Sequence, residues 1–255
     1  MSLKRIHFFR EIVIVLVLSL VLVSSLNIKT VNAQAGQVML KPSDDTYVDS
    51  SNSNSNYGGQ NILSIQNYQE AILNQTYKYE SIVWLKFDLS SIPDGAEVDG
   101  AALQLFANSV AQTFNVHACS CSDNSWTEMA LTYLNMPSYN ATSKDTAILT
   151  TEWQLYNWSV VDIVGNALEN HAKAVTIVLL DPSLHVQNSS SPISRLWFYS
   201  KEAGQSFSDE RFYPKLAIHW SGVVAEFPTF LVLPLLMIAT LLAVIIYRKK
   251  HAKIP

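Results

Sequence analysis

Apolar residues are concentrated at the two ends of this 255-residue chain, and this distribution limits what the middle can form. Residues 12–23 make an uncharged apolar run near the start, and residues 229–247 make a second one near the end. About 190 residues remain between the end segments, which is enough for one sizeable hydrophobic core. Two or more large domains are therefore excluded.

Residues 1–33 have the composition of a secretory signal peptide. Lys4, Arg5 and Arg10 precede the apolar run, and Val31-Asn32-Ala33 offers small residues where a signal peptidase cleaves. We predict a signal helix that is removed on secretion. The alternative is an uncleaved signal anchor, because a run of about 15 residues, at about 1.5 Å each, nearly spans a bilayer.

Residues 229–247 are predicted to form a single transmembrane helix. The segment holds no charged residue, and its helical length matches the hydrocarbon core of roughly 30 Å. Basic residues follow in the tail, residues 248–255, so the positive-inside rule places the tail in the cytoplasm and the domain before it outside the cell. A short linker, residues 223–228, leads into the membrane. A buried core helix is the alternative.

The tripeptide Glu226-Phe227-Pro228 precedes this predicted helix. It resembles the C-terminal sorting signals of some archaeal surface proteins, from which a transpeptidase-like enzyme removes the helix. This resemblance implies a lipid anchor in the mature protein, which would still face outward. Either way, we expect a cell-membrane protein with the bulk of its chain outside the cell.

The central segment, residues 34–222, is acidic. It holds 9 Lys and Arg against 19 Asp and Glu, a net charge of −10. Such a surface repels phosphate backbones, so we expect no nucleic-acid partner. The segment also contains four Asn-x-Ser/Thr tripeptides, which agree with a glycosylated extracellular protein. Their acceptors are Asn74, Asn140, Asn157 and Asn188.

Cys119 and Cys121 are the chain's two cysteines, and one residue separates them. The loop is too short for a relaxed disulfide, which leaves a strained local bridge or two free thiols. A structural zinc site around His117 is not expected, because there is no second pair of clustered ligands.

Short stretches of alternating apolar residues predict β-strands between turn signals. In residues 83–89, Val83, Leu85 and Phe87 share one face, and Trp84 and Lys86 share the other. One segment, residues 161–171, has helical spacing instead. Many short strands with such turns predict an antiparallel β-sandwich or barrel. The remaining predicted strands are residues 102–106, 114–118, 175–180, 196–199 and 216–220.

Several separate segments within residues 41–220 together resemble one family. They are Asp45-Thr46-Tyr47-Val48, Asn56-Tyr57-Gly58-Gly59, residues 85–93, Trp126-Thr127-Glu128, residues 131–133, residues 135–137, residues 198–202 and residues 214–218. The chain is similar to the DNRLRE domain, also classed as carbohydrate-binding module family 96 and related to disaggregatase repeats. The resemblance implies an all-β jelly-roll sandwich that binds polysaccharide. The chain departs from the family in two places. Lys201 stands where arginine is usual, and residues 68–79 form a longer link than usual.

Candidate sugar-binding residues are aromatic and cationic side chains that alternate against the predicted core. A pyranose packs its C–H face on an aromatic ring while polar side chains bind its hydroxyl groups. The alternative is that a loop or the second sheet covers these rings. The predicted carbohydrate-binding residues are Trp84, Lys86, Arg195, Trp197, Tyr199 and Lys201.

Acidic clusters offer a possible structural calcium site, as is common in jelly-roll binding modules. Asp44 and Asp45 beside Asp49, or Asp209 with Glu210, would supply carboxylate oxygens. Asp45 is the best single ligand, and solvated carboxylates are the alternative. No other cofactor is expected.

Three classes of function remain for such a chain. Catalysis is not expected, because hydrolase, zinc-helix and phosphate-loop motifs are missing. We predict a membrane-anchored, non-catalytic module that binds a polysaccharide or cell-wall glycan. The alternatives are a structural or adhesion protein that binds proteins or itself and, after it, a polysaccharide-cleaving enzyme.

Overall fold

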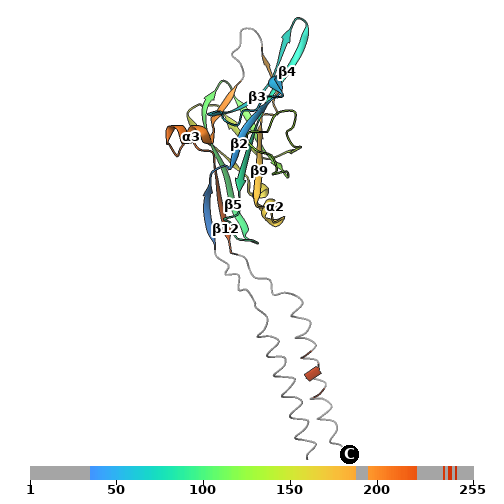
Figure 1. The fold of residues 1–255 in the computed structure, drawn as a ribbon, viewed down its shortest axis with the longest axis vertical. Coiled ribbons are helices and arrows are strands. Elements are labelled where there is room, and N and C mark those ends of the chain that lie inside the picture. Colours follow the sequence, from blue (N-terminus) through green and yellow to red (C-terminus); the bar gives the residue numbers. More distant parts are fainter. Residues whose placement is uncertain (1–34, 188–194, 223–237, 239–240, 243–244, 246–255) are drawn as a thin grey trace, which may run out of the picture. The chain divides into compact units, whose positions relative to one another are not determined.

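The computed structural model describes residues 35–187, 195–222, 238, 241–242 and 245 (Figure 1). The predicted signal peptide, linker and cytoplasmic tail, most of the predicted membrane segment, and Asn188 lie outside these residues. Within the described part of the chain, no helix has both the length and the apolar character needed to cross a membrane.

Twelve strands, two short α-helices and one 3-10 turn make up the described domain. In chain order they are β1 (Gly36–Leu40), β2 (Asp44–Asp49), η1 (Ser50–Asn52), β3 (Ile62–Ile72), β4 (Gln75–Asp88), β5 (Glu97–Val110), β6 (Phe114–Cys121), β7 (Asn140–Leu149), β8 (Gln154–Ser159), α2 (Val161–Glu169), β9 (Ala174–Leu180), β10 (His185–Gln187), β11 (Leu196–Tyr199), α3 (Lys201–Phe207) and β12 (Lys215–Ser221).

The strands form one curled sheet whose two halves are joined by β3. The first half runs β1-β12-β5-β11-β3, with β8 also paired to β5, and the second runs β3-β4-β9-β6-β7, with β2 paired to β4. Residues 62–65 of β3 pair with β11, and residues 66–72 pair with β4. Apart from the parallel pairing of β10 with β3, the ladders are antiparallel. This agrees with the predicted antiparallel β-sandwich, and the finer jelly-roll connectivity stays a prediction.

The first and last strands of the domain pair with each other. β1 lies antiparallel to β12, and Gly36 stands opposite Trp220. A side chain at Gly36 would collide with the Trp220 ring, since an added Cβ would lie 2.4 Å from it. The absence of a side chain at Gly36 therefore permits this close pairing.

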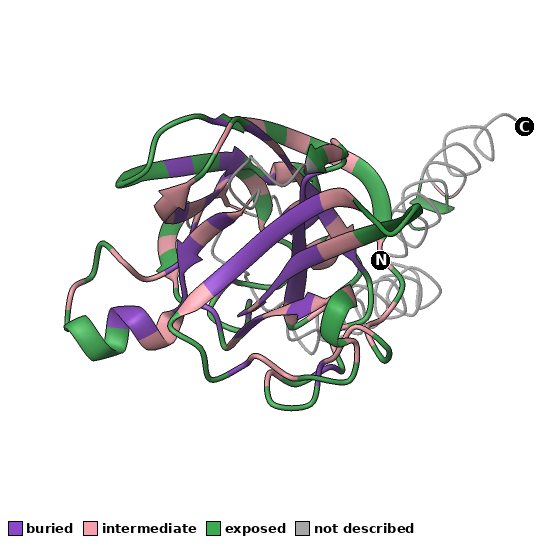
Figure 2. Ribbon diagram, turned by 90° about the horizontal axis from the view of Figure 1, so that it is seen from above, coloured by how far each residue is buried: buried purple, intermediate pink, exposed green. Residues whose placement is uncertain are grey.

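The strands predicted from alternation are found within β4, β5, β6, β9, β11 and β12, and the predicted helix is α2. In β4, Val83, Leu85 and Phe87 are fully buried in the main core between the two halves of the sandwich. Their partners in this core include Leu103 of β5 and Ile177 of β9. Figure 2 shows buried segments along the strands and exposed residues mainly on the connections.

A second apolar cluster lies on the outer face of the second half of the sandwich. Ile82 and Trp84, which point away from the main core, pack here with Val178 and with residues of an irregular segment, residues 122–139. We call residues 122–139 the covering segment. Its side chains in this cluster are Trp126, Leu131, Tyr133, Met136 and Tyr139.

Cys119 and Cys121 are two free, buried thiols in this second cluster. Burial raises the pKa of both thiols, so the neutral form is favoured.

The long link noted at residues 68–79 is a β-hairpin in which β3 and β4 extend past the rest of the domain (Figure 1). Leu73 and Asn74 form its two-residue turn, and both have positive φ, as a type I′ turn requires. The rings of Tyr68 and Tyr79 stack across the strands with centroids 4.9 Å apart. We call the part of this hairpin beyond Asn67 the arm.

Candidate carbohydrate-binding face and acidic cluster

The predicted binding residues do not lie on one face. Trp84 was expected to be exposed, but it is fully buried beneath the covering segment, with its ring edge-on to those of Trp126 and Tyr139. The burial of Trp84 means that it cannot stack on a sugar at the surface. Lys86 lies at the edge of the same cluster, where its ammonium donates to the carbonyl of Trp126 and pairs with Asp44 at 3.1 Å.

Trp197 and Tyr199 of β11 do point outward from the first half of the sandwich, opposite the buried Leu196 and Phe198. Trp197 is half-buried, whereas Tyr199 is only 8% exposed because other rings cover it. Arg195 lies just before β11. Burial raises the pKa of Tyr47 to about 12, and the charge of the nearby Arg195 acts in the opposite direction.

Tyr199 is the centre of an aromatic cluster on this outer face. Its ring centroid lies 4.5 Å from that of Phe212, 5.7 Å from Phe207, 6.1 Å from Phe106 and 6.3 Å from Trp153. Trp153 is 60% exposed and Phe207 is 55% exposed. The two exposed rings, Trp153 and Phe207, thus pack edge-on against the buried Tyr199 ring. We call the set the aromatic platform: Phe106, Trp153, Tyr199, Phe207 and Phe212.

The backbone of Trp153 is strained. Its φ is +58°, a region that bulky residues rarely adopt and that costs of the order of 1 kcal/mol or more. The Trp153 N–H donates to the carbonyl of Ala107 at 2.8 Å. The Tyr156 hydroxyl accepts from Thr151 N–H and donates to the Thr151 carbonyl, at 3.0 and 2.9 Å. These bonds hold an exposed indole in an unfavourable backbone conformation, which is typical of functional sites.

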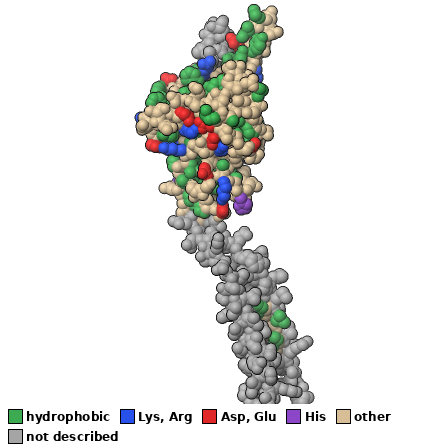
Figure 3. Space-filling view, in the orientation of Figure 1, with side chains coloured by type: hydrophobic (Ala, Val, Ile, Leu, Met, Phe, Trp, Pro, Cys, Tyr) green, Lys and Arg blue, Asp and Glu red, His purple; other side chains and the backbone are tan. Residues whose placement is uncertain are grey.

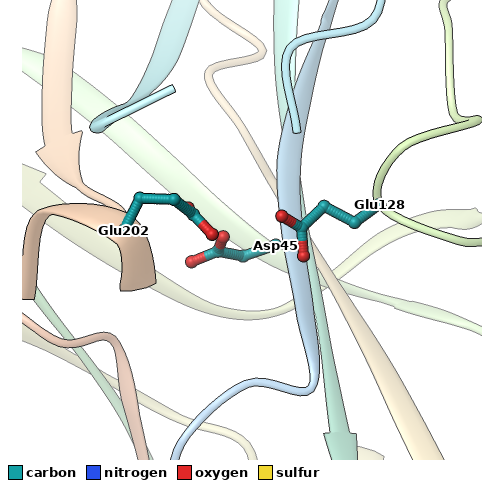
Figure 4. A group of neighbouring side chains, drawn as sticks. All are labelled: Asp45, Glu128 and Glu202. Carbon is teal, nitrogen blue, oxygen red and sulfur yellow. The ribbon is translucent and has the colours of Figure 1, made fainter. Parts of the chain in front are cut away.

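A second group of interest is a cluster of three carboxylates from three distant segments (Figure 4). Asp45 comes from β2, Glu128 from the covering segment and Glu202 from α3. One oxygen of each lies within 4.8 Å of the others. Figure 4 shows the three carboxyl groups turned toward one another. We call Asp45, Glu128 and Glu202 the acidic cluster.

Lys201 is the cation beside the acidic cluster. Its ammonium pairs with Glu128, and with Glu202 at 2.8 Å. Its backbone N–H donates to Asp45 Oδ2 at 2.8 Å. Lys201 and Glu202 lie in the first turn of α3, where both side chains reach the cluster. Figure 3 shows acidic and basic side chains gathered on the side of the domain that carries α3.

Burial dominates the electrostatics of this site. It raises the pKa of Asp45 well above its usual range, and the neighbouring Glu202 acts in the same direction. Burial also raises the pKa of Glu128 despite its pairing with Lys201. For Lys201, burial alone would lower the pKa, but the hydrogen bonds to Glu128 and Glu202 outweigh it and raise the pKa.

The comparison with protein families finds that the model of carbohydrate-binding module family 96 matches residues 36–208. The chain belongs to this family. The resemblance predicted from the separate segments is thereby confirmed. Carbohydrate-binding modules are binding domains rather than catalytic ones, so the family assigns carbohydrate binding to this domain. A search of curated proteins gives no match.

In this family 96 module, four of the short segments that carried the resemblance meet around the acidic cluster, those of Asp45, Asn56, Glu128 and Glu202. The Asn56 side chain donates to the carbonyls of Glu128 and Leu131, at 2.7 and 2.8 Å. The Glu128 N–H donates to Asp44 Oδ1 at 3.1 Å. Gly58 lies so close that an added Cβ would be 2.4 Å from the Glu128 carbonyl oxygen. The covering segment of the module is thus fastened at Glu128.

The other acidic residues considered for calcium have different partners in the module. Asp44 pairs with Lys86, and Asp49 caps η1 by accepting from Ser51 N–H at 2.7 Å. Asp209 pairs with Arg211, and Glu210 pairs with Lys41 and Lys215. Of the proposed ligands, Asp45 therefore remains, now with Glu128 and Glu202, which the sequence did not indicate.

Trp153 and Phe207 of the module were also not predicted. Buried Tyr156 and Trp158 alternate in β8, and extending that alternation backward would have placed Trp153 on the outer face. No comparable pattern points to Phe207, because the short helix α3 follows directly after a strand.

The three glycosylation acceptors within the described residues of the module, Asn74, Asn140 and Asn157, are exposed. Asn74 lies in the turn of the arm. At Asn140 the side-chain oxygen accepts from the N–H of Thr142, the hydroxyl residue of its tripeptide, at 3.0 Å. Glycosylation at these sites stays a prediction.

Proposed function

We propose that this protein binds a polysaccharide at the cell surface through the aromatic platform and does not cleave it. The observation that carries the proposal is Trp153, whose exposed ring is held on strained backbone at the edge of a ring cluster. Membership of family 96 supports carbohydrate as the ligand class. A sugar ring would pack its C–H face on Trp153 or Phe207.

Polar groups beside the rings suit the hydroxyl groups of a sugar. Gln104 and Asn108 alternate with buried residues along β5, so they share the outer face with Phe106. Their amides can both donate and accept hydrogen bonds. The net charge of −10 over residues 34–222 favours an uncharged glycan over an acidic one.

Binding without cleavage is supported by the position of the acids. Glycoside hydrolysis needs two carboxyl groups that flank the scissile bond. Asp45, at the centre of the acidic cluster, is 1% exposed, and Lys201 pairs with the two glutamates. This arrangement leaves no room for a sugar between the carboxyl groups.

Surface display is supported by the sequence. The charge-free residues 229–247 and the basic tail after them suit a single-pass anchor with the domain outside the cell. In this proposal the partners of the protein are the membrane and a glycan of the cell wall or the surroundings. A nucleic acid is not among them.

The test uses the full chain in detergent micelles on an array of neutral and acidic polysaccharides, with an assay for new reducing ends. We expect retention on a neutral glycan without new ends. Trp153→Ala and Phe207→Ala should each weaken binding about 10-fold, equivalent to about 1.4 kcal/mol.

The matched control is Tyr77→Ala, which removes another partly exposed ring, on the arm. It should bind as the unchanged protein does. If Trp153→Ala and Phe207→Ala bound the glycan as tightly as the unchanged protein does, the aromatic platform would be rejected as the binding site. New reducing ends would establish an enzyme instead.

A second candidate function, adhesion to a protein partner, is favoured by the arm. Leu73 at its turn is 95% exposed, and Ile72 and Tyr77 beside it are also exposed. Val186 of β10, which pairs with the arm, is exposed too. Exposed apolar side chains gathered on one projecting element suit a protein-binding surface. Absence of retention on every glycan, together with self-association lost in Leu73→Asp, would favour this function.

A further inference from the structure

We propose that Asp45, Glu128 and Glu202 form a calcium-binding site. Their carboxyl groups converge, with one oxygen of each within 4.8 Å of the others (Figure 4). The site is separate from the aromatic platform, so this proposal does not depend on the proposed function.

The observation that points to a ligand is the orphaned oxygen of Asp45. Asp45 is 1% exposed, and its Oδ1 has no hydrogen-bond partner among the described residues. Glu202 Oε2 is likewise buried without a partner in the described part of the chain. A buried carboxylate oxygen without a donor is costly, because it has lost its water and gained no replacement. A bound cation would satisfy both oxygens.

Lys201 does not account for the whole cluster. Its ammonium pairs with Glu128 and Glu202, and its backbone N–H reaches the other oxygen of Asp45. Metal ligation uses the ionised carboxylates. Three of them beside one ammonium carry a net charge of −2, which one divalent cation would neutralise.

The donor chemistry selects the metal. All three candidate ligands are carboxylates, and hard oxygen donors suit calcium or magnesium rather than zinc. Magnesium usually retains several waters and uses one or two protein carboxylates. Calcium accepts six to eight oxygens in flexible geometry, so a buried group of three carboxylates suits calcium better.

Calcium would join three parts of the fold that are distant in sequence. Asp45 belongs to β2, Glu128 to the covering segment and Glu202 to α3. Helix α3 ends in Phe207, one of the exposed rings of the aromatic platform. Calcium would therefore stabilise both the covering segment and the helix that presents this ring.

The test is calorimetric titration of the chelator-treated full chain in detergent micelles with CaCl2, followed by thermal unfolding. We expect one calcium per chain. At calcium about 100-fold above Kd, Tm should rise by about 5–10 °C. Magnesium at the same concentration should give a smaller rise.

Variants with opposite expected effects locate the site. Asp45→Asn and Glu202→Gln should each weaken calcium binding about 10-fold or more, because each removes a charged ligand. Lys201→Gln should tighten it, because it removes a competing cation. The matched control is Asp162→Asn, since the Asp162 side chain is 70% exposed and pairs with Lys144 at 3.9 Å.

If calcium titration of the unchanged protein released or absorbed no heat of binding, the proposal would be overturned. Binding that Asp45→Asn and Glu202→Gln leave intact would also overturn it. The metal-free Tm of Asp45→Asn checks its folding, and we expect it not to fall, because the substitution removes a buried charge. Glycan retention is measured separately, so failure of this site leaves the platform testable.

Discussion

Both outer faces of the sandwich carry a tryptophan on a strand, but the tryptophan is buried on one face and only half-buried on the other. On the second half, Trp84 of β4 points away from the main core and is then enclosed by the covering segment. On the first half, Trp197 and the aromatic platform point away from the main core, and no comparable layer covers them among the described residues. Trp153 stays 60% exposed. Alternation along a strand therefore identifies the side of the sheet but not whether another segment covers that side.

The difference arises from residues outside the strands. The covering segment supplies Trp126, Leu131 and Tyr139 to the second cluster, and Asn56 and Gly58 allow it to approach closely. On the platform side, α3 and the turn before β8 contribute rings at the margins instead of a lid. Short irregular segments thus decide which face can meet a ligand.

The largest expected effect contrasts the two faces directly. Trp84→Ala should lower the free energy of unfolding by about 3–5 kcal/mol, because it leaves a cavity beneath the covering segment. Trp197→Ala, at a half-buried position, should cost less than about 1.5 kcal/mol. Denaturant unfolding measures both. Equal losses of unfolding free energy in the two variants would contradict the contrast between a covered Trp84 and a partly exposed Trp197.

An intermediate effect is expected where the covering segment is fastened. Gly58→Ala places a Cβ 2.4 Å from the Glu128 carbonyl oxygen, so the segment must shift. We expect a loss of about 1–3 kcal/mol and faster proteolytic cleavage within residues 122–139. Gly59→Ala is the control, since nothing lies within 4 Å of a Cβ there. Unchanged cleavage in the Gly58 variant would contradict the close packing.

The smallest effect separates the ring of Trp153 from its backbone. Trp153→Gly and Trp153→Ala both remove the indole, so glycan binding should fall equally. Because glycine tolerates the positive φ of this position, the glycine variant should be more stable than the alanine variant by about 0.5–1 kcal/mol. Comparing their thermal unfolding checks this, and the reverse order would contradict a strained backbone at Trp153.

Much of the fold follows from sequence patterns. Strands that face the main core alternate regularly, and β4, β5, β6, β9, β11 and β12 were predicted for this reason. β7 was not predicted, because its residues are mostly exposed and polar. β3 was also missed, since buried Ser64, Gln66 and Asn67 interrupt its apolar pattern where it passes from one half of the sandwich to the other.

The sites were harder to predict than the fold. Asp45 was selected as a cation ligand, but its partners Glu128 and Glu202 are far away in sequence and meet only through tertiary packing. Trp84 satisfied every local criterion for an outward ring, and only the fold of residues 122–139 reveals its burial. Local patterns predict the direction of a side chain, whereas its neighbours depend on contacts between distant segments.

The pairing of β1 with β12 has a practical consequence for engineering. Since Gly36 stands opposite Trp220, the polypeptide enters and leaves the sandwich at adjacent points. A unit of this kind can be spliced into a surface loop of a carrier protein with short spacers, because the loop ends need not be forced apart.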